Sequence, residues 1–303
     1  MRIFVTGVSG YAGYHAGINL SQRGHTVIGL VRNPLQERLK LLRIHEVEIV
    51  TGDLYDVASS RDILETCDAI IHTMLDKKRL AETDRALFAA LEGLSQRPVK
   101  RRFIYTTGCS IFGKVGLDLI DETVEPNPQH PLAFRRELEK EAVALKNVVT
   151  TVVRPGFMYG FDGFNSVSTD WFAMAREGDP VFRGDQTKGW SWIHIADLAE
   201  AYRLILEADE KPVAGEIFHL GDDLRPLCVD VMRACVKAAG WNGDIRFEGS
   251  KKGDNISTWF DQNEFITSHK ANTILGWLPL HPGVIACAPQ IHQSWLAAED
   301  KGA

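Results

Sequence analysis

Short apolar runs alternate with longer amphipathic stretches through the first half of the chain. The runs are rich in Val and Ile, which favours strands, and the stretches repeat apolar residues at helical spacing. The predicted strands are 2–6, 26–31, 47–50, 69–72, 102–106 and 148–153. The first predicted helix follows strand 2–6 and runs to about Arg23, and a helix-capable stretch lies near 35–42. The other predicted helices are 57–66, 79–95 and 132–145. This alternation predicts an α/β fold with a doubly wound parallel sheet and helices on both faces.

The alternation weakens beyond residue 156, which indicates a second, smaller lobe. The predicted elements there are a helix near 171–174, a turn at 184–189, strands 192–194 and 216–220, and helices 197–208, 228–240 and 282–298. Strand 216–220 is expected to return to the main sheet. The predicted domains are therefore 1–165 with 191–221 returning to it, and a substrate-binding lobe of 166–190 and 222–303.

Composition excludes some classes of protein. The chain has 303 residues, of which 45% are apolar and 24% charged, as in a soluble globular protein. A net charge of −6 gives no support to nucleic-acid or anionic-membrane binding. No apolar run approaches the ~20 residues of a membrane span, and no secretory signal is evident. The cysteines are odd in number and form no C-x-x-C pair, so we expect a cytoplasmic protein without a disulfide framework or a metal site.

Three glycines follow the first predicted strand directly. Gly7, Gly10 and Gly13 have the spacing G-x-x-G-x-x-G and open a helix. The first N–H groups of a helix lack intrahelical partners and carry partial positive charge, so a pyrophosphate binds there when small residues let the backbone come close. The pattern predicts a dinucleotide-binding loop of the Rossmann type, with Tyr11 and Ala12 also in contact. The alternative is an ordinary glycine turn.

Five segments carry a further likeness. They are a glycine fingerprint (Thr6–Gly13), an adenine-side turn (Gly52–Leu54), a strand-five segment (Ile104–Gly113), a nicotinamide-side loop (Arg154–Gly160) and a second-domain signature (Trp192–Ala199). Together they resemble the extended short-chain dehydrogenase/reductase superfamily, of the NAD-dependent epimerase/dehydratase type. The resemblance implies a nicotinamide cofactor, a small-molecule substrate and a homodimer formed by the helices that match 79–95 and 132–145.

The residues that move protons in this superfamily are missing from their expected places. The family uses a Ser or Thr after strand five and a Tyr-x-x-x-Lys pair on the next helix, whose tyrosine acts as acid or base. Here Phe134 falls at the tyrosine position and Leu138 at the lysine position. Gly108 falls at the serine position, or Thr107 if the register shifts by one. The resemblance therefore implies an atypical branch with an intact cofactor site and an altered reaction centre.

The end of the second predicted strand bears on the choice of cofactor. Val31 stands where NAD-preferring members place an acid that binds the ribose 2′-hydroxyl, and Arg32 follows it. An arginine can hold a 2′-phosphate through two hydrogen bonds. The sequence therefore predicts NADP rather than NAD. The alternative is a solvated arginine at a strand end.

The other predicted cofactor contacts come from further strand ends. Asp53 is expected to accept from the adenine amine, with Leu54 on the ring, and the alternative is an Asx-type turn. His72 ends strand 69–72 beside the expected path of the ribose, and the alternative is a buried histidine hydrogen-bonded to backbone. Thr106 and Pro155 complete the set, with Pro155 against the nicotinamide carboxamide.

Three side chains are candidates for the chemistry. Thr107 and Cys109 lie at the carboxyl end of strand five, where open α/β sheets place their active crevice. Thr107 could bond a substrate oxygen. Cys109 could be a nucleophile if its pKa were depressed, and is otherwise a packing residue. Tyr159 is the first candidate for a substitute acid, with packing as its alternative role.

The predicted substrate contacts are Arg135, Trp190 and Trp192. Arg135 would bind an acidic or carbonyl group, or is a solvated charge paired with a glutamate of its own helix. The two tryptophans would line an aromatic pocket, or form the core of the small lobe.

The leading hypothesis is an NADP-dependent oxidoreductase that acts on a carbonyl or hydroxyl of a small, partly aromatic molecule. The first alternative is a cofactor-assisted isomerase, epimerase or lyase of the same fold. The second alternative is a non-catalytic sensor that binds NADP(H) and signals through a partner.

Overall fold

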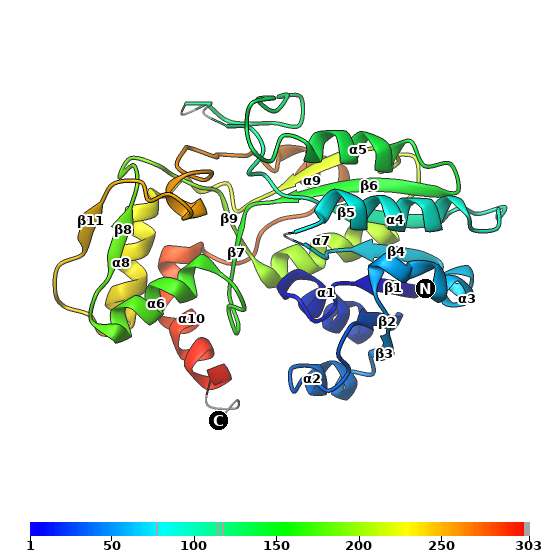
Figure 1. Cartoon of the computed structure of the whole chain (residues 1–303), viewed down its shortest axis with the longest axis horizontal. Helices are drawn as coiled ribbons and strands as arrows, with labels where there is room; N and C mark the ends of the chain where they lie inside the picture. The colour runs from blue at the N-terminus through cyan, green and yellow to red at the C-terminus, as the bar shows by residue number, and fades with distance from the viewer. Residues whose placement is uncertain (77, 114, 117, 300–303) are drawn as a thin grey trace.

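The computed structural model describes residues 1–76, 78–113, 115–116 and 118–299. Its centre is a seven-stranded parallel sheet with the strand order β10-β6-β5-β4-β1-β2-β3 (Figure 1). The strands are β1 (Arg2–Thr6), β2 (Thr26–Val31), β3 (Glu48–Thr51), β4 (Ala69–His72), β5 (Arg101–Thr106), β6 (Val148–Pro155) and β10 (Ile217–Leu220). The strand order reverses between β1 and β4, and such a switch point is where doubly wound sheets open a crevice for ligands.

Helices cover both faces of this sheet because successive side chains of a strand point to opposite sides. In β1, Ile3 and Val5 join one apolar cluster and Phe4 joins another. The first face carries α1 (Tyr11–Gln22), α2 (Leu39–Ile44) and α7 (Ile195–Glu207). The second face carries α3 (Arg61–Thr66), α4 (Leu80–Glu92) and α5 (Arg135–Val143), and the 3-10 segment η1 (Leu54–Ser60) packs beside α4.

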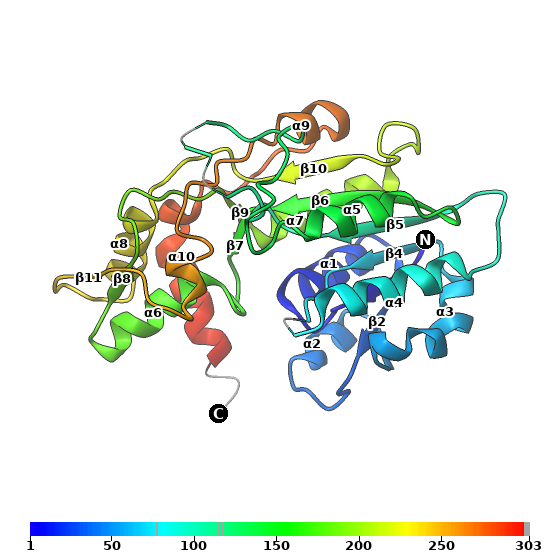
Figure 2. The ribbon, with the colours of Figure 1, turned by 45° about the horizontal axis from the view of Figure 1, so that its top comes forward.

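A smaller lobe stands beside the sheet, at the left of Figure 1. Its own apolar cluster includes Trp171, Phe172, Trp190 and Trp192. The lobe contains α6 (Val167–Glu177), β8 (Val181–Arg183), α8 (Cys228–Ala238), β11 (Arg246–Glu248), η2 (Asn255–Ser257) and α10 (Val284–Glu299). Between lobe and sheet, β7 (Phe157–Tyr159) pairs with β9 (Trp192–His194), and α9 (His269–Leu275) packs by β10 (Figure 2). The chain crosses between the two parts several times.

The predicted α/β fold with a doubly wound parallel sheet is confirmed, including the return of strand 216–220 to the sheet beside β6. Strands β7, β8 and β11 were not predicted, because runs of three residues are too short to show a period. The predicted start of helix 132–145 is wrong, since α5 begins at Arg135. The preceding residues form tight turns, in which Ala133 N–H donates to His130 C=O at 2.9 Å.

A helix that crosses a lipid bilayer must be long and predominantly apolar. Within the described ranges, no helix combines the length and the apolar character that a membrane crossing requires.

Candidate active site

The glycine loop joins β1 to α1 at the carboxyl edge of the sheet. Gly7 has φ +76°, and a Cβ on it would lie 2.8 Å from the backbone nitrogen of Met74. A Cβ on Gly13 would lie 2.5 Å from the carbonyl oxygen of Gly7. Gly10 is the N-cap of α1 without a side-chain cap, and the first turn holds no acidic residue. An uncapped, acid-free helix end behind a close-approach loop fits a pyrophosphate.

The predicted adenine contacts lie at the ends of β2 and β3. Val31 is buried, and Arg32, directly after it, is exposed. Asp53 Oδ1 accepts from Tyr55 N–H at 3.1 Å, which is the Asx-type turn foreseen as an alternative. Leu54 is buried in the cluster under η1 and α4. The adenine contacts of Asp53 and Leu54 stay predictions.

Arg38 is a residue that sequence reasoning missed. Its Nε donates to the Ser9 carbonyl of the glycine loop at 3.1 Å, and its guanidinium pairs with Asp162. The guanidinium also lies 4.0 Å from the centre of the Tyr14 ring. Burial alone would raise the pKa of Asp162, but a hydrogen bond from His15 and the Arg38 charge outweigh it and lower the pKa to about 2. Arg38 and Asp162 are 124 positions apart, so no local pattern indicates their contact.

Two predicted cofactor residues instead hold the fold together. Tyr11 O–H donates to Gly160 C=O at 2.5 Å and is buried. His72 is fully buried, with Nδ1 2.7 Å from Thr6 Oγ1 and Nε2 3.1 Å from Asp84 Oδ1. This matches the alternative of a buried histidine, although its partners are side chains rather than backbone. We therefore assign no cofactor contact to the His72 side chain.

The remaining cofactor candidates lie at the ends of β5 and β6. The hydroxyl oxygen of Thr106 is 2.9 Å from that of Tyr202 on α7, so this side chain turns toward the helix layer. Pro155 closes β6, and its carbonyl accepts from Cys109 N–H at 3.1 Å. The loop after β5 thus runs along the end of β6.

A buried ion network begins at Thr107. Its hydroxyl donates to Glu139 Oε1 at 2.7 Å, and Arg154 binds both oxygens of Glu139, with Nε at 2.9 Å from Oε1. Glu139 and Arg154 are buried. Arg154 also lies 3.2 Å from Nε2 of His219, whose pKa burial and the arginine charge lower to about 3. The neutral imidazole accepts from Arg154, so every polar group of this network is satisfied.

A second hydroxyl–carboxylate pair lies three residues further along the same loop. Ser110 Oγ donates to Glu264 Oε2 at 2.6 Å, and Gln262 Nε2 donates to Oε1 at 2.8 Å. Glu264 is fully buried. Burial raises its pKa to about 7, against the smaller lowering effect of the two hydrogen bonds. Sequence reasoning missed this pair because nothing local to Glu264 distinguishes it from a surface glutamate.

The structure does not bring Phe134 and Leu138 together at the end of β5. Leu138 is buried in the cluster between sheet and helices, and Phe134 is the N-cap of α5 and largely exposed. The predicted register was therefore wrong about which side chains face the strand ends. Arg135 and Glu139 take these places, four residues apart, and an Arg135 terminal nitrogen lies 3.4 Å from the Thr106 carbonyl. The Arg135 Nε is buried without a hydrogen-bond partner.

Two of the proposed chemical residues are packing residues in the structure. Burial raises the pKa of the Cys109 thiol well above its usual range, which excludes a thiolate nucleophile at neutral pH. Tyr159 is fully buried in the core of the lobe, and burial raises its pKa strongly. Its hydroxyl is near the Cys287 thiol, but the geometry there is not that of a hydrogen bond. Neither side chain presents a reactive atom to a ligand.

The two tryptophans belong to the same core. Trp190 and Trp192 have no exposed surface, and Trp190 stacks on Phe157 with ring centres 4.0 Å apart. Of the two roles left open by the sequence, the structure shows packing. The aromatic pocket predicted at these residues is not present.

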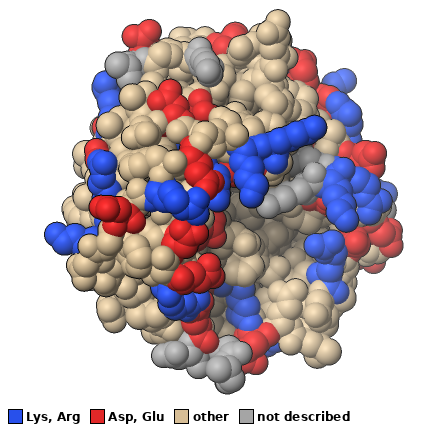
Figure 3. All heavy atoms as spheres, turned by 60° about the vertical axis from the view of Figure 1, so that its left-hand side comes forward, with Lys and Arg blue, Asp and Glu red and all other residues tan. Residues whose placement is uncertain are grey.

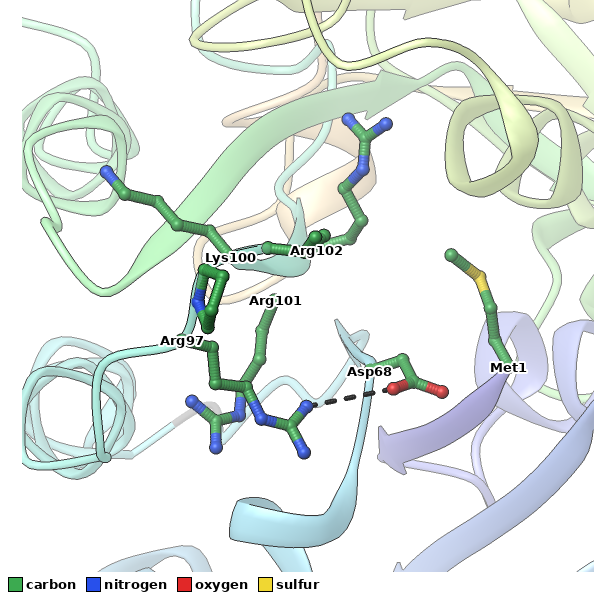
Figure 4. A pocket seen from close by; sticks show the side chains of 8 residues that line it. Met1, Asp68, Arg97, Lys100, Arg101 and Arg102 are labelled. Atoms are coloured by element: carbon green, nitrogen blue, oxygen red, sulfur yellow. Dashed lines mark ion pairs between the residues drawn. The ribbon is translucent and has the colours of Figure 1, made fainter.

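The surface has two hollows that bear on ligand binding. On the face brought forward in Figure 3, the surface is hollowed near the middle, and Lys or Arg side chains border the hollow. A different, basic hollow is lined by Met1, Asp68, Arg97, Lys100, Arg101 and Arg102 (Figure 4). These residues stand at the starts of β1, β4 and β5. That hollow is thus on the opposite edge of the sheet from the glycine loop and is not part of the candidate site.

Comparisons with known proteins agree with this geometry. The profile of the NAD dependent epimerase/dehydratase family matches residues 3–221. An uncharacterized protein of Schizosaccharomyces pombe is 27% identical over 227 residues, covering 72% of this chain and 74% of the relative. The 4-hydroxy-2-methyl-3-oxo-4-farnesyl-3,4-dihydroquinoline-1-oxide ketoreductase of Stigmatella aurantiaca is 26% identical over 249 residues, or 73% of this chain and 68% of the relative.

A solved structure shares the whole fold. The dTDP-glucose 4,6-dehydratase from Bacillus anthracis, in complex with NAD, aligns with a TM-score of 0.84 at 17% identity, over 99% of this chain and 98% of that one. The family match spans the glycine loop, the ends of β5 and β6, and the return of β10 to the sheet. The chain therefore belongs to the NAD-dependent epimerase/dehydratase family and is an NAD(P)-dependent enzyme.

Proposed function

We propose that the chain is an NADP-dependent oxidoreductase that interconverts a carbonyl and a hydroxyl group on a small molecule. One observation carries this proposal. The glycine loop, Thr107 and Ser110 follow strands of one parallel sheet, so they stand at the same edge of it. An anionic cofactor bound at the start of α1 would lie beside hydroxyl groups that can bond a substrate oxygen.

The preference for NADP rests on the end of β2. Residue 31 is a valine, so its side chain would neither repel a 2′-phosphate nor bind a free 2′-hydroxyl. The exposed Arg32 supplies a cation at the same strand end. The neighbouring Arg38 is already engaged by Ser9 and Asp162, which leaves Arg32 as the phosphate ligand we propose.

The substrate is proposed to place its oxygen near the loop after β5 and to present a carbonyl or acidic group to Arg135. The unpartnered Nε of Arg135 supports this second contact, since a buried guanidinium nitrogen is costly to leave unbonded. The aromatic character of the substrate is supported by the similarity to a quinoline ketoreductase alone, since Trp190 and Trp192 are buried and offer no pocket. The nicotinamide would supply or accept the hydride.

Two measurements test this function. Fluorescence titration should show tighter binding of NADPH than of NADH, and Arg32→Ala should weaken NADPH binding roughly 10- to 100-fold, as for loss of a hydrogen bond to a charged group. NADH binding to the same variant should be unchanged. A panel of ketones and aldehydes, quinoline-type ketones included, should then oxidise NADPH. Tight binding with no turnover in either direction would contradict an oxidoreductase.

An epimerase or lyase that returns the cofactor unchanged is the second candidate. It is supported by the similarity to the UDP-glucose 4-epimerase of Lactobacillus helveticus, which is 23% identical over 97% of this chain and 98% of the relative. Product formation without net oxidation of NADPH would identify this case.

A further inference from the structure

The loop after β5 carries the hydroxyl of Ser110, which is not part of the ion network of Thr107, Glu139 and Arg154. Cys109, Ile111 and Phe112 are buried, and Ser110 between them is partly exposed. Because Thr107 N–H donates to Val153 C=O and Cys109 N–H to Pro155 C=O, the loop follows the end of β6 up to Ser110. The exposed side of Ser110 therefore lies at the carboxyl edge, where the crevice of an α/β sheet opens.

The partner of Ser110 comes from the other part of the molecule. Glu264 lies 154 positions away and runs beside the segment before β9, since Ser191 N–H donates to its carbonyl at 2.9 Å and its own N–H donates to Gly189 C=O. The Ser110–Glu264 bond thus joins the sheet to the lobe. Ligand sites form preferentially at such junctions.

We propose that Ser110 and Glu264 transfer the proton in the reaction, in the place of the tyrosine and lysine that this chain lacks. The inference rests on the proposed oxidoreductase function and assigns its acid–base residues. In the reducing direction, a bound reduced nicotinamide would supply the hydride to the carbonyl carbon, and Ser110 gives its hydroxyl proton to the carbonyl oxygen. Ser110 is reprotonated by the carboxylic acid of Glu264. Glu264 thereby becomes a carboxylate, and it regains a proton from water after product release.

The hydrogen bond between the two residues can reverse. When Glu264 is a carboxylate, Ser110 donates to it and its proton faces inward, as the 2.6 Å contact shows. When Glu264 is neutral, its own O–H donates to Ser110 Oγ, and the serine proton is free to point to a substrate oxygen. The pair is therefore able to donate in one state and to accept in the other, which acid–base catalysis in both directions requires.

The surroundings keep both states accessible at neutral pH. Burial raises the pKa of Glu264 to about 7, and among the described residues no cation contacts its carboxylate. Near it lie the buried thiols of Cys109 and Cys228, whose pKa values burial raises first and the Glu264 charge raises further, and His130, which lies 3.4 Å from Gln262. The charge of Lys188, which lowers the pKa of Cys228, is paired with Asp261 at 3.0 Å. None of these compensates the negative charge.

The test compares Ser110→Ala and Glu264→Gln with Glu122→Gln as a matched control. Glu122 is another carboxyl whose pKa burial raises, but it accepts from the backbone of His219. In the wild type, kcat for reduction of a responsive ketone by NADPH should fall as the pH rises through about 7. Both variants should lose ~10²–10⁴-fold in kcat, Glu264→Gln should lose this pH limb, and the control should keep both. Ser110→Thr should restore most of the rate.

A readout without turnover accompanies the kinetics. Infrared difference spectroscopy of the wild type with NADP bound should show a carboxyl band that titrates near pH 7 and is absent from Glu264→Gln. Absence of that band, or variants that bind NADPH and keep the wild-type kcat and pH limb, would overturn the proton-transfer assignment alone. A wild type that binds NADPH and turns over neither carbonyls nor alcohols would overturn the proposed function, and the assignment with it.

Discussion

Two buried glutamates, both bonded to the loop after β5, differ in the charge of their other partners. Glu139 and Glu264 are both without exposed surface, and each accepts from a hydroxyl of the loop after β5. Glu139 also meets the guanidinium of Arg154, which binds both its oxygens. Glu264 has neutral donors only, from Ser110 and Gln262, and its pKa rises to about 7. One carboxylate thus has a guanidinium partner in a buried ion pair, and the pKa of the other, which has neutral donors, is raised.

The difference teaches that burial alone does not decide what a carboxyl does. A buried charge needs a compensating charge or it becomes neutral. The penultimate residue of β6 is Arg154, and its guanidinium reaches Glu139 on α5. The sequence supplies an amide, Gln262, in the equivalent place beside Glu264.

The largest expected effect comes from neutralising the ion network. Glu139→Gln should leave Arg154 buried with only His219 and one amide oxygen, and the free energy of unfolding should fall by about 3–5 kcal/mol, as when one partner of a buried pair is removed. Urea unfolding followed by circular dichroism measures this. Glu264→Gln is the control and should unfold at no lower urea concentration than wild type at neutral pH. Equal losses in both variants would erase the distinction between the two carboxyls.

The next effect is a dependence of stability on pH. A folded-state pKa of about 7 against 4.5 means that, between these values, the unfolded chain releases a proton from Glu264 that the native chain retains. The contribution of this group to stability is full below pH 4.5 and declines until about pH 7, by up to roughly 3 kcal/mol at 1.36 kcal/mol per pKa unit. The difference in unfolding free energy between Glu264→Gln and wild type, measured across this range, should therefore grow with pH and then level off. A flat difference would show that Glu264 ionises normally.

A smaller effect is expected from the hydroxyl of the first pair. Thr107→Val removes a donor to Glu139 and keeps its size and the Arg154 contacts, so stability should fall by about 1 kcal/mol. We expect kcat to fall far less than in Ser110→Ala, since the Thr107 hydroxyl donates to a carboxylate that Arg154 already binds through both oxygens. Steady-state kinetics of the two variants side by side test this. A greater loss of kcat in Thr107→Val would transfer the chemical role to the first pair.

The smallest effect should come from Tyr159→Phe. The hydroxyl is buried and makes no hydrogen bond, so its removal should leave kcat unchanged and should not lower the melting temperature. Thermal unfolding and the NADPH assay are the two measurements. A marked loss of activity would return Tyr159 to the set of proton donors.

Local pattern determined the framework of this protein. The alternation of apolar runs and amphipathic stretches foretold the parallel sheet, and three glycines after the first strand foretold the loop that opens α1, because period and backbone freedom are properties of neighbouring residues. The replacement of the tyrosine and lysine was inferred from the family resemblance and stays a prediction. The sequence did not show which side chains of α5 lie at the strand ends, because the turns before Arg135 set which face of the helix points to the sheet.

Tertiary structure alone decided which charges are paired. Ser110 and Glu264 are 154 positions apart, and Arg38 and Asp162 are 124 apart, so both contacts exist only once the chain has folded. Burial then sets their chemistry, because the free energy of a charge depends on what surrounds it and not on its neighbours in the chain. The sequence by itself determined a dinucleotide fold without its usual proton donor, and the packing of two distant segments decided where a substitute can stand.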